Sequence, residues 1–254
     1  MAETEKTYEE YVEDKSLAKV EEETQGNMTL IRHLEELRHR LIYSILAIAI
    51  GTGICYFFIE EIMHYLTVPA GKLYYMQPAE AFFTYLKVSV FAGFLVALPV
   101  VLYHVWRFFL PALTAGERML IGVVVPVSAG LFFLGLAFSF FFVLPAGIKF
   151  FLGFGTEDLQ PLLSVGKYLD FVISFVLPFG FIFELPLVIV ILAKMGIVNS
   201  AFLKGKRRIV IFMTFVIGAV ISPTPDVFSQ SMIALPMIFL YEISLFIVRF
   251  ILRK

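Results

Sequence analysis

The sequence has little of what most catalytic, metal-binding and secreted proteins rely on. It contains one cysteine, Cys55, which excludes a fold held together by disulfide bonds. Its four histidines are scattered over separate segments, and neither a P-loop nor an HExxH zinc motif occurs, so ATP and metal chemistry have no candidate residues. Only 16% of the residues are charged, and 20 basic residues nearly cancel 21 acidic ones. No basic stripe indicates nucleic-acid binding.

Apolar side chains, by contrast, are present in great excess. They make up 59% of the 254 residues, phenylalanine alone contributes 29, and the mean hydropathy is +0.88. Soluble domains are about 45–50% apolar and about 25% charged. A water-soluble fold of this size has too little interior for so many apolar side chains. The composition therefore predicts an all-α integral membrane protein.

Residues 1–27 differ from the rest of the chain. They hold nine acidic residues against three lysines and contain few apolar residues. Such a segment buries too little apolar surface to offset the entropy lost on ordering, so we expect a mobile acidic tail. Residues 28–254 are predicted to form one transmembrane domain.

Six apolar segments predict six transmembrane helices. A bilayer core about 30 Å thick needs about 20 apolar residues of helix. Four segments meet this length and two are marginal: Leu41–Ile59, Phe82–Trp106, Met119–Leu144 and Tyr168–Met195, then Ile209–Ile221 and Ser231–Leu252. The fifth segment reaches only roughly 20 Å at 1.5 Å per residue. We predict that it still spans the membrane; a re-entrant loop is the alternative.

Lysine and arginine alternate between the two sides of this arrangement. Counted near the ends of the six spans, in order along the chain, the basic residues number 3, 1, 2, 2, 5, 0 and 3. Short loops rich in Lys and Arg stay in the cytoplasm. Both termini are therefore predicted to be cytoplasmic, and the stretch after the fifth span is predicted to lie on the trans side.

Prolines interrupt four of the predicted spans, at Pro99, Pro126, Pro178, Pro186 and Pro236. Each lacks a backbone N–H and tends to kink its helix. Two interpretations stay open: ordinary irregularity of membrane helices, or a bent, concave bundle whose kinks create a binding face. The first three spans share no motif with the last three, as the halves of an inverted-repeat transporter do.

Three ionisable residues lie within the predicted spans. Lys87 is about one turn from the start of its span, so we expect its side chain to extend to the interface. Glu242 is expected to bond a neighbouring helix. Glu184 is the deepest of the three, and a charge at the bilayer centre costs at least about 2.5–3.5 kcal/mol. We expect Glu184 to be a polar docking point for another helix, or a titrating group.

Four motifs follow one another along the chain. A stretch with two glutamates and an arginine leads into the first span, an aromatic and acidic segment joins the second and third, Phe-Glu-Leu-Pro lies in the fourth, and a proline-rich turn precedes the sixth: His33–Arg38, Leu102–Arg118, Phe183–Pro186 and Ser222–Gln230. Through these motifs the chain, from about Leu30 to Leu252, resembles the TatC family, the multi-spanning subunit of the twin-arginine protein translocase. The last motif begins Ser-Pro-Thr-Pro-Asp, one residue longer than the more usual Thr-Pro-Pro-Asp.

The resemblance implies a receptor for the twin-arginine signal peptides of folded cargo proteins, in the cytoplasmic (inner) membrane of a prokaryote. It implies assembly with TatA-like and TatB-like single-span proteins and with further copies of the chain. Transport would use the proton-motive force, without ATP or any cofactor. By motif position, the resemblance assigns signal-peptide binding to Glu36, Leu37, Arg38, Phe108 and Glu117.

The resemblance also implies a partner-subunit site. Glu184 would meet a polar group on the partner's transmembrane helix, and Ser222 and Gln230 would be further contacts. Pro225 and Asp226 would shape the trans-side loop before the sixth span. Glutamates suit the signal arginines, because carboxylates accept the guanidinium fork in a bidentate manner that a lysine ammonium cannot match.

Two functions of other classes are weaker alternatives. A proton-coupled secondary transporter could use Glu184 as a proton relay, but inverted repeats and further midplane polar residues are missing from the sequence. An intramembrane hydrolase needs a nucleophile and a base, or a metal cluster, at membrane depth, and the sequence offers neither. We therefore predict a protein that is not an enzyme, with no catalytic and no metal-binding residues.

Overall fold

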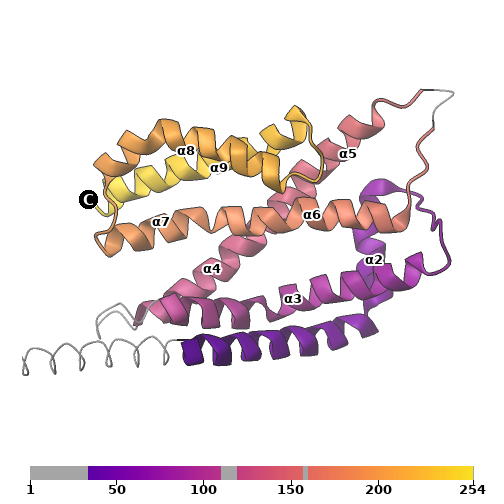
Figure 1. Cartoon of the computed structure of the whole chain (residues 1–254), viewed down its shortest axis with the longest axis horizontal. Coiled ribbons are helices and arrows are strands. Elements are labelled where there is room, and N and C mark those ends of the chain that lie inside the picture. The colour runs from indigo at the N-terminus through magenta and orange to yellow at the C-terminus, as the bar shows by residue number, and fades with distance from the viewer. Residues whose placement is uncertain (1–33, 110–118, 157–159, 254) are drawn as a thin grey trace, which may run out of the picture. The chain divides into compact units, whose positions relative to one another are not determined.

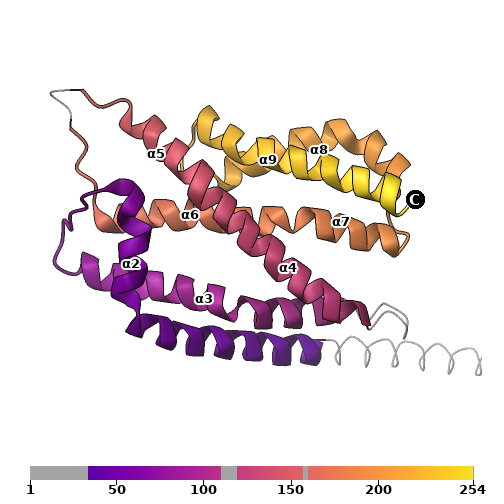
Figure 2. The ribbon, with the colours of Figure 1, turned by 180° about the vertical axis from the view of Figure 1, so that it is seen from behind.

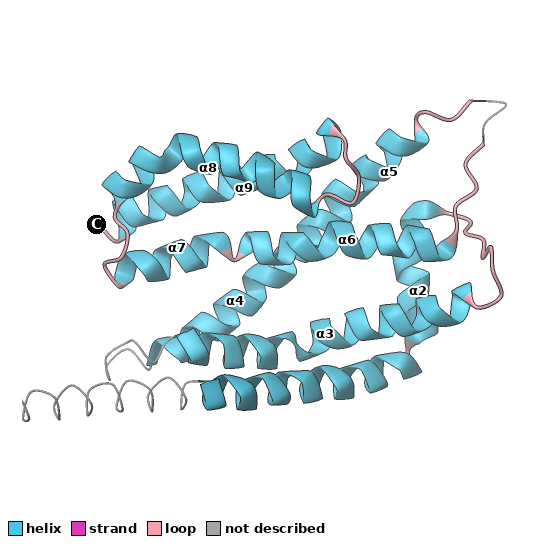
Figure 3. Cartoon of the chain, viewed as in Figure 1, coloured by secondary structure: helices cyan, strands magenta, loops and turns pink. Residues whose placement is uncertain are grey.

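The apolar segments fold as helices throughout the part of the chain that the structure describes. The computed structural model describes residues 34–109, 119–156 and 160–253. The chain divides into two compact units, Met1–Leu46 and Ala47–Lys254. Within the described ranges there is no strand, only an isolated bridge between Tyr74 and Ser164 (Figure 3). The prediction of an all-α protein is confirmed.

The first described helix, Leu34–Phe57, runs from one unit into the other. The helices that follow are α2 Ile59–Thr67, α3 Glu80–Phe109, α4 Met119–Phe138, α5 Leu144–Leu152, α6 Val165–Phe183, α7 Leu185–Lys194, α8 Ser200–Ile221 and α9 Val227–Phe246. A 3₁₀ turn continues α2, and π-helical segments continue α4 and α9: Val68–Ala70, Ser139–Val143 and Ile247–Ile251. Figures 1 and 2 show α4 and α5 as one oblique rod that crosses α6, and α8 and α9 as a hairpin.

The observed helices match the predicted spans closely. In the described part of the chain, five helices are long and apolar enough to cross a membrane: Leu34–Phe57, Glu80–Phe108, Gly122–Leu152, Val165–Lys194 and Val227–Ile251. The predicted fifth span, Ile209–Ile221, is the second half of α8, whose 22 residues begin with a strongly basic first half. The sequence did not predict α2, a nine-residue amphipathic helix that buries Ile59 and Met63.

Helices α4 and α6 approach each other closely because a glycine of each faces the other helix. A Cβ atom on Gly135 would lie 2.3 Å from the carbonyl oxygen of Phe179, and one on Gly180 would lie 2.5 Å from the ring of Phe132. Phe132 and Phe179 are fully buried. Small residues let membrane helices pack backbone to backbone in this way. The crossing brings the middle of α4 against the end of α6, where the candidate site lies.

The fourth predicted span divides at Glu184, between α6 and α7. The Glu184 backbone (φ −74°, ψ −18°) ends α6, and its N–H donates to the Phe181 carbonyl oxygen at 3.1 Å. Pro186 then lies in the first turn of α7, where no backbone N–H is required. The other four prolines of the predicted spans lie inside helices that continue past them: Pro99, Pro126, Pro178 and Pro236.

Two of the ionisable residues in the spans form ion pairs. Lys87 on α3 pairs with Asp170 on α6, and both side chains are half exposed. The prediction that Lys87 extends to the interface stays a prediction, and the structure adds a carboxylate on the adjacent helix that pairs with its ammonium group. Glu242 on α9 pairs with Arg207 on α8 at 2.6 Å, which confirms that it bonds a neighbouring helix.

The loops before α3 and α6 are joined through Glu80. Its Oε1 accepts hydrogen bonds from the Ser164 hydroxyl and, at 2.9 Å, from the Gly166 N–H, and its Oε2 accepts the Met76 N–H at 2.5 Å. The backbone of Tyr74 adds hydrogen bonds to residues 163 and 165 on either side of the same serine. These contacts fix the ends of α3 and α6 against each other.

Candidate functional site

Three helices meet in a chain of hydrogen bonds that ends on Glu184. The indole Nε1–H of Trp106, near the end of α3, donates to the Ser128 hydroxyl of α4 at 2.9 Å. The Ser128 hydroxyl in turn lies 2.9 Å from Glu184 Oε2, at the α6–α7 break. Because an indole can only donate, the serine accepts from Trp106 and its own proton is free to point at the carboxyl group.

The other carboxyl oxygen, Glu184 Oε1, is buried and accepts no hydrogen bond from the residues that the structure describes. Leaving a buried polar atom without a partner costs about 1–3 kcal/mol. Glu184 Oε2 therefore has a hydrogen-bond partner in the bundle, whereas Oε1 has none among the described residues.

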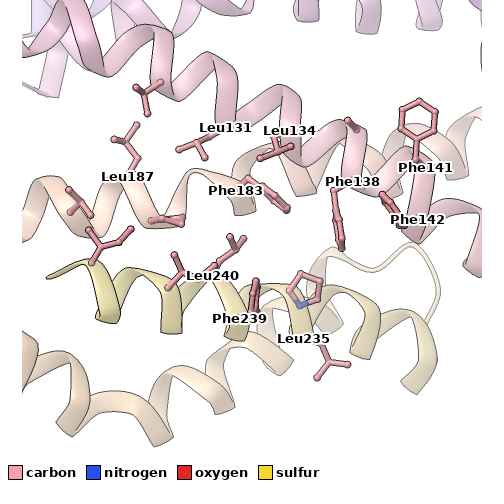
Figure 4. Close-up of a pocket in the computed structure, with 17 residues that line it drawn as sticks. Leu131, Leu134, Phe138, Phe141, Phe142, Phe183, Leu187, Leu235, Phe239 and Leu240 are labelled. Carbon is pink, nitrogen blue, oxygen red and sulfur yellow. The ribbon is translucent and has the colours of Figure 1, made fainter. Parts of the chain in front are cut away.

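A large apolar groove lies beside this site. Its volume is about 960 Å³, and side chains from α4, α7 and α9 converge on it (Figure 4). All 17 lining residues are apolar: Val127, Leu131, Leu134, Ala137, Phe138, Phe141, Phe142, Phe183, Pro186, Leu187, Val190, Leu235, Pro236, Phe239, Leu240, Ile243 and Ile247. On α9 and its π-helical continuation they extend from Leu235 to Ile247, roughly 18 Å at 1.5 Å per residue. The groove is long enough for several turns of an apolar helix.

Glu184 lies next to residues that line this groove but is not itself part of the lining. Its neighbour Phe183 lines the groove, as does Val127 next to Ser128 on α4. The hydrogen bond from Ser128 to Glu184 thus joins α4 to the α6–α7 break along one edge of the groove. Ser128 and Glu184 do not line the groove, so this polar pair lies directly behind its apolar wall.

Two further residues of the predicted partner site form bonds inside the bundle. Ser222 ends α8, and its hydroxyl donates to the Thr224 carbonyl oxygen at 2.7 Å. Gln230 Nε2, on α9, donates to the Phe215 carbonyl oxygen of α8 at 2.8 Å. Both residues hold the α8–α9 hairpin together, and their contact with a partner stays a prediction.

The turn before α9 is organised by Asp226. Its carboxylate caps the helix by accepting the Ser229 N–H at 2.8 Å. Burial alone would raise the pKa of Asp226, but hydrogen bonds from Thr224, Ser229 and the Phe228 N–H outweigh it, so this pKa lies below its usual range. Pro225, directly before the cap, is exposed. This turn is the predicted loop before the sixth span.

The predicted signal-peptide residues fall in separate parts of the chain. Glu36, Leu37 and Arg38 belong to the first unit, on the helix Leu34–Phe57, and Phe108 lies near the end of α3 in the second unit. Glu117 lies outside the described residues. Their joint site therefore stays a prediction.

Glu36 already binds a guanidinium group. Arg40, one turn further along the same helix, donates to Glu36 Oε1 through Nε at 3.2 Å and through a terminal nitrogen. In the described part of the chain, Arg40 thus engages the Glu36 carboxylate through Oε1.

Two functional candidates carried little signal in the sequence. Ser128 is a small polar residue in an apolar run, and nothing in its spacing marks it. Trp106 belongs to the second motif, where its role is that of an aromatic anchor. Only the α4–α6 crossing, set by Gly135 and Gly180, shows that Ser128 meets Glu184.

Comparison with known proteins decides the family. Residues 32–236 match the family model of the Sec-independent protein translocase protein TatC. The chain belongs to the TatC family. It is 39% identical over 231 residues to TatC of Carboxydothermus hydrogenoformans, covering 89% of this chain and 95% of the relative. For TatC of Aquifex aeolicus the identity is 41% over 235 residues, covering 89% and 97% of the two chains. For that of Escherichia coli it is 37% over 232 residues, covering 89% and 90%.

Solved structures agree with this assignment. Two crystal structures of the twin-arginine translocase receptor TatC match with TM-scores of 0.75 and 0.76, at 40% and 41% sequence identity. The matches cover 85% of this chain and 98% and 99% of the solved chains. The resemblance to the TatC family is therefore confirmed. As a TatC protein, the chain is a multi-pass membrane component of a protein translocase, and this family is not enzymatic.

Proposed function

We propose that this chain is the receptor core of a twin-arginine translocase in the cytoplasmic (inner) membrane of a prokaryote. It binds the twin-arginine signal peptides of folded proteins and assembles with single-span TatA-like and TatB-like subunits and with further copies of itself. The proton-motive force drives export, and both termini face the cytoplasm. The observation that carries the proposal is the apolar groove with Glu184 adjacent to its lining residues Phe183 and Pro186, in a chain of the TatC family.

Signal recognition rests on Glu36 and Glu117, with Leu37, Arg38 and Phe108 shaping the surface around them. The Arg40–Glu36 pair supports this assignment, because a signal arginine would make the same kind of bond. One exposed ion pair contributes about 0–1 kcal/mol, too little for selective binding. Two carboxylates that each engage one arginine fork give both affinity and discrimination against lysine.

Crosslinking to a twin-arginine signal peptide tests this assignment. Because one exposed ion pair contributes about 0–1 kcal/mol, Glu36→Ala or Glu117→Ala alone should weaken the crosslink by up to about 5-fold, and the double variant by up to about 30-fold. Glu35→Ala, a neighbouring acid on the same helix, is the matched control and should bind normally. If the Glu36→Ala/Glu117→Ala double variant still prefers Arg-Arg over Lys-Lys peptides as strongly as the wild type, other residues read the signal.

Partner assembly rests on the groove and on Glu184, with Ser222 and Gln230 as further contacts at the α8–α9 turn. The transmembrane helix of a single-span subunit fills the apolar groove, and a polar side chain on it bonds the carboxyl oxygen that the described bundle leaves unpaired. Membrane helices associate through such packing and interhelical hydrogen bonds, which explains the pairing of an apolar groove with one polar group.

Two substitutions separate docking from proton relay. Glu184→Gln keeps the shape and hydrogen bonding of the side chain but cannot titrate, whereas Glu184→Leu loses both. Docking predicts that the Gln variant still captures the single-span subunit from native membranes and that the Leu variant does not. A proton-coupled transport role predicts that the Gln variant captures it normally but transports nothing. Wild-type capture and transport in both variants would exclude both roles.

A groove variant tests the same proposal without touching a charge. Leu235→Trp places a larger side chain in the groove and should reduce capture of the single-span subunit. Val220→Trp, on the exposed face of α8 and outside the groove, is the matched control and should leave capture unchanged.

A further inference from the structure

A second pocket lies between the first turns of α8 and the last turns of α9. Its volume is about 440 Å³. Four charged side chains line it: Lys204 and Arg207 from α8, and Glu242 and Arg249 from α9 and its π-helical continuation. The first turns of α8 and the last turns of α9 lie at the opposite end of the hairpin from the turn that joins the two helices (Figure 1).

The frame of this pocket is fixed by buried contacts behind it. The Tyr241 hydroxyl donates to the Leu203 carbonyl oxygen at 2.6 Å, which ties α9 to α8. Tyr241 and Leu203 belong to a buried cluster with Ala193 and Val248. Arg249 lies in the π-helical segment Ile247–Ile251, and π-helical turns occur frequently at functional sites. The charged side chains therefore stand on a preformed scaffold.

The charge of the pocket is unbalanced. The only acid that lines it, Glu242, pairs with Arg207 at 2.6 Å. In the described part of the chain, no carboxylate lies within ion-pair distance of Lys204 or Arg249. The pocket therefore presents two cations whose charge is available to an anion.

The pocket is also apolar on one side. Leu245, Phe246 and Phe250 line it, and the two phenylalanines are more than half exposed. A free anion gains nothing by contact with this apolar surface, whereas an amphiphile with an anionic head and an acyl chain can pack its acyl chain against it. Basic pockets between transmembrane helices are typical sites for anionic lipid headgroups.

The short apolar stretch of α8 brings lipid headgroups to the same depth in the bilayer as the pocket. Ile209–Ile221 spans roughly 20 Å, about 10 Å less than the hydrocarbon core of a typical bilayer. Such a mismatch thins the bilayer locally, so headgroups move toward the basic residues that precede Ile209. The pocket thus lies where a headgroup phosphate and the first part of an acyl chain meet.

We infer that this pocket binds one anionic phospholipid, with its phosphodiester between Lys204 and Arg249 and an acyl chain along Phe246 and Phe250. Arginine offers a phosphate two parallel N–H donors, and lysine adds a point charge. The Arg207–Glu242 pair forms the inner wall and keeps Glu242 from repelling the phosphate. This inference is independent of the signal-peptide and partner sites proposed above.

Lipid binding to the purified full-length chain tests the inference. The detergent-solubilised chain is titrated with phosphatidylglycerol, and bound lipid is counted by native mass spectrometry. A basic residue near an anionic headgroup contributes about 1 kcal/mol, so Lys204→Gln/Arg249→Gln should bind about 30-fold more weakly. Lys206→Gln/Arg208→Gln changes the net charge equally, on the same helix but outside the pocket, and should stay within about twofold of the wild type. Ala201→Trp fills the pocket without changing any charge and should also lose the lipid.

Each alternative gives a different result. Equal losses in the two double variants would mean diffuse attraction to net charge, and unchanged binding in Lys204→Gln/Arg249→Gln would mean that the lipid binds elsewhere. Competition by inorganic phosphate at the same concentration would indicate a site for free anions. Equal binding of phosphatidylcholine, which has the same phosphodiester but a cationic choline group, would show that the pocket does not select an anionic lipid and would overturn the inference. Thermal unfolding and Trp106 fluorescence of every variant establish that the bundle is intact, so that a loss reports on the pocket.

Discussion

Replacing Ser128 with alanine removes one oxygen atom that side chains from two other helices share. In the wild type, the hydroxyl accepts the Trp106 Nε1–H and contacts Glu184 Oε2, both at 2.9 Å. Ser128 is fully buried and Trp106 nearly so, which leaves little room for water to replace the hydroxyl. After the substitution, the indole N–H and both carboxyl oxygens lack a protein partner within the described bundle.

The expected loss follows from two interhelical hydrogen bonds. Such bonds in membrane proteins average about 0.6 kcal/mol and reach about 1.7 kcal/mol, so Ser128→Ala should lower the free energy of unfolding by about 1–3 kcal/mol. Trp106→Phe breaks only the first bond. Both substitutions break the hydrogen bond between Trp106 and Ser128. The loss of unfolding free energy in the Ser128→Ala/Trp106→Phe double variant should therefore be smaller than the sum of the two single losses, by about the free energy of one hydrogen bond.

Two measurements, the free energy of unfolding and the tryptophan fluorescence, test this prediction. Unfolding of the purified chain in mixed micelles gives the free energies, with Ser89→Ala as the matched control. Ser89 is also fully buried, but its hydroxyl bonds only the Tyr85 carbonyl of its own helix, at 2.7 Å. Trp106 is the only tryptophan in the sequence, so fluorescence reports on this site alone and should shift to shorter wavelength when the indole loses its acceptor. A Ser128→Ala variant with the stability of the Ser89→Ala control and unchanged emission would refute the three-helix chain.

Three further outcomes follow from the fold. Gly135→Ala places a Cβ 2.3 Å from the Phe179 carbonyl oxygen, so it should destabilise the bundle by about 1–3 kcal/mol in the same unfolding assay, whereas Gly130→Ala on the same helix meets nothing within 4 Å and should not. The lowered pKa of Asp226 means that its carboxylate stabilises the fold above the ordinary Asp pKa of about 3.9 and loses this contribution as the pH falls through the folded pKa. The stability advantage of the wild type over Asp226→Asn should therefore shrink between pH 6 and pH 3; an advantage independent of pH would contradict the cap. A cysteine at position 224, with Cys55 replaced, should react with an impermeant maleimide from outside intact cells, and reaction only after permeabilisation would mean that α8 does not cross the membrane.

The helices could be predicted from the sequence because apolar length is a one-dimensional property. Runs of about 20 apolar residues mark a span wherever they occur, and the observed helices follow them closely. Helix α2 was not predicted by this criterion. It has only nine residues, with Glu60 and Glu61 in its first turn, and is therefore too short and too polar to span a membrane. Its amphipathic pattern becomes meaningful only when Ile59 and Met63 have a bundle to pack against.

The candidate site could be predicted only in part, because its members are brought together by packing. Glu184 stands out in the sequence as an acid at membrane depth. Its partner Ser128 is 56 residues away, and their contact depends on how closely α4 approaches α6. That distance is set by Gly135 and Gly180, whose effect depends on the residues that face them. For the same reason the ion pair of Lys87 with Asp170, 83 residues apart, was not expected.

The described bundle uses only one of the two carboxyl oxygens at position 184. A buried polar side chain stabilises a fold less than an apolar one of similar size unless its polar atoms are all bonded. Here the bundle bonds Glu184 Oε2 through Ser128 and leaves Oε1 without a partner among the described residues. A leucine would avoid this cost but would also lose the hydrogen bond to Ser128, so the isolated bundle accounts for one carboxyl oxygen and not for the other. A polar group on a helix in the adjacent groove does explain it, because that helix would complete the hydrogen bonding that the bundle itself leaves open.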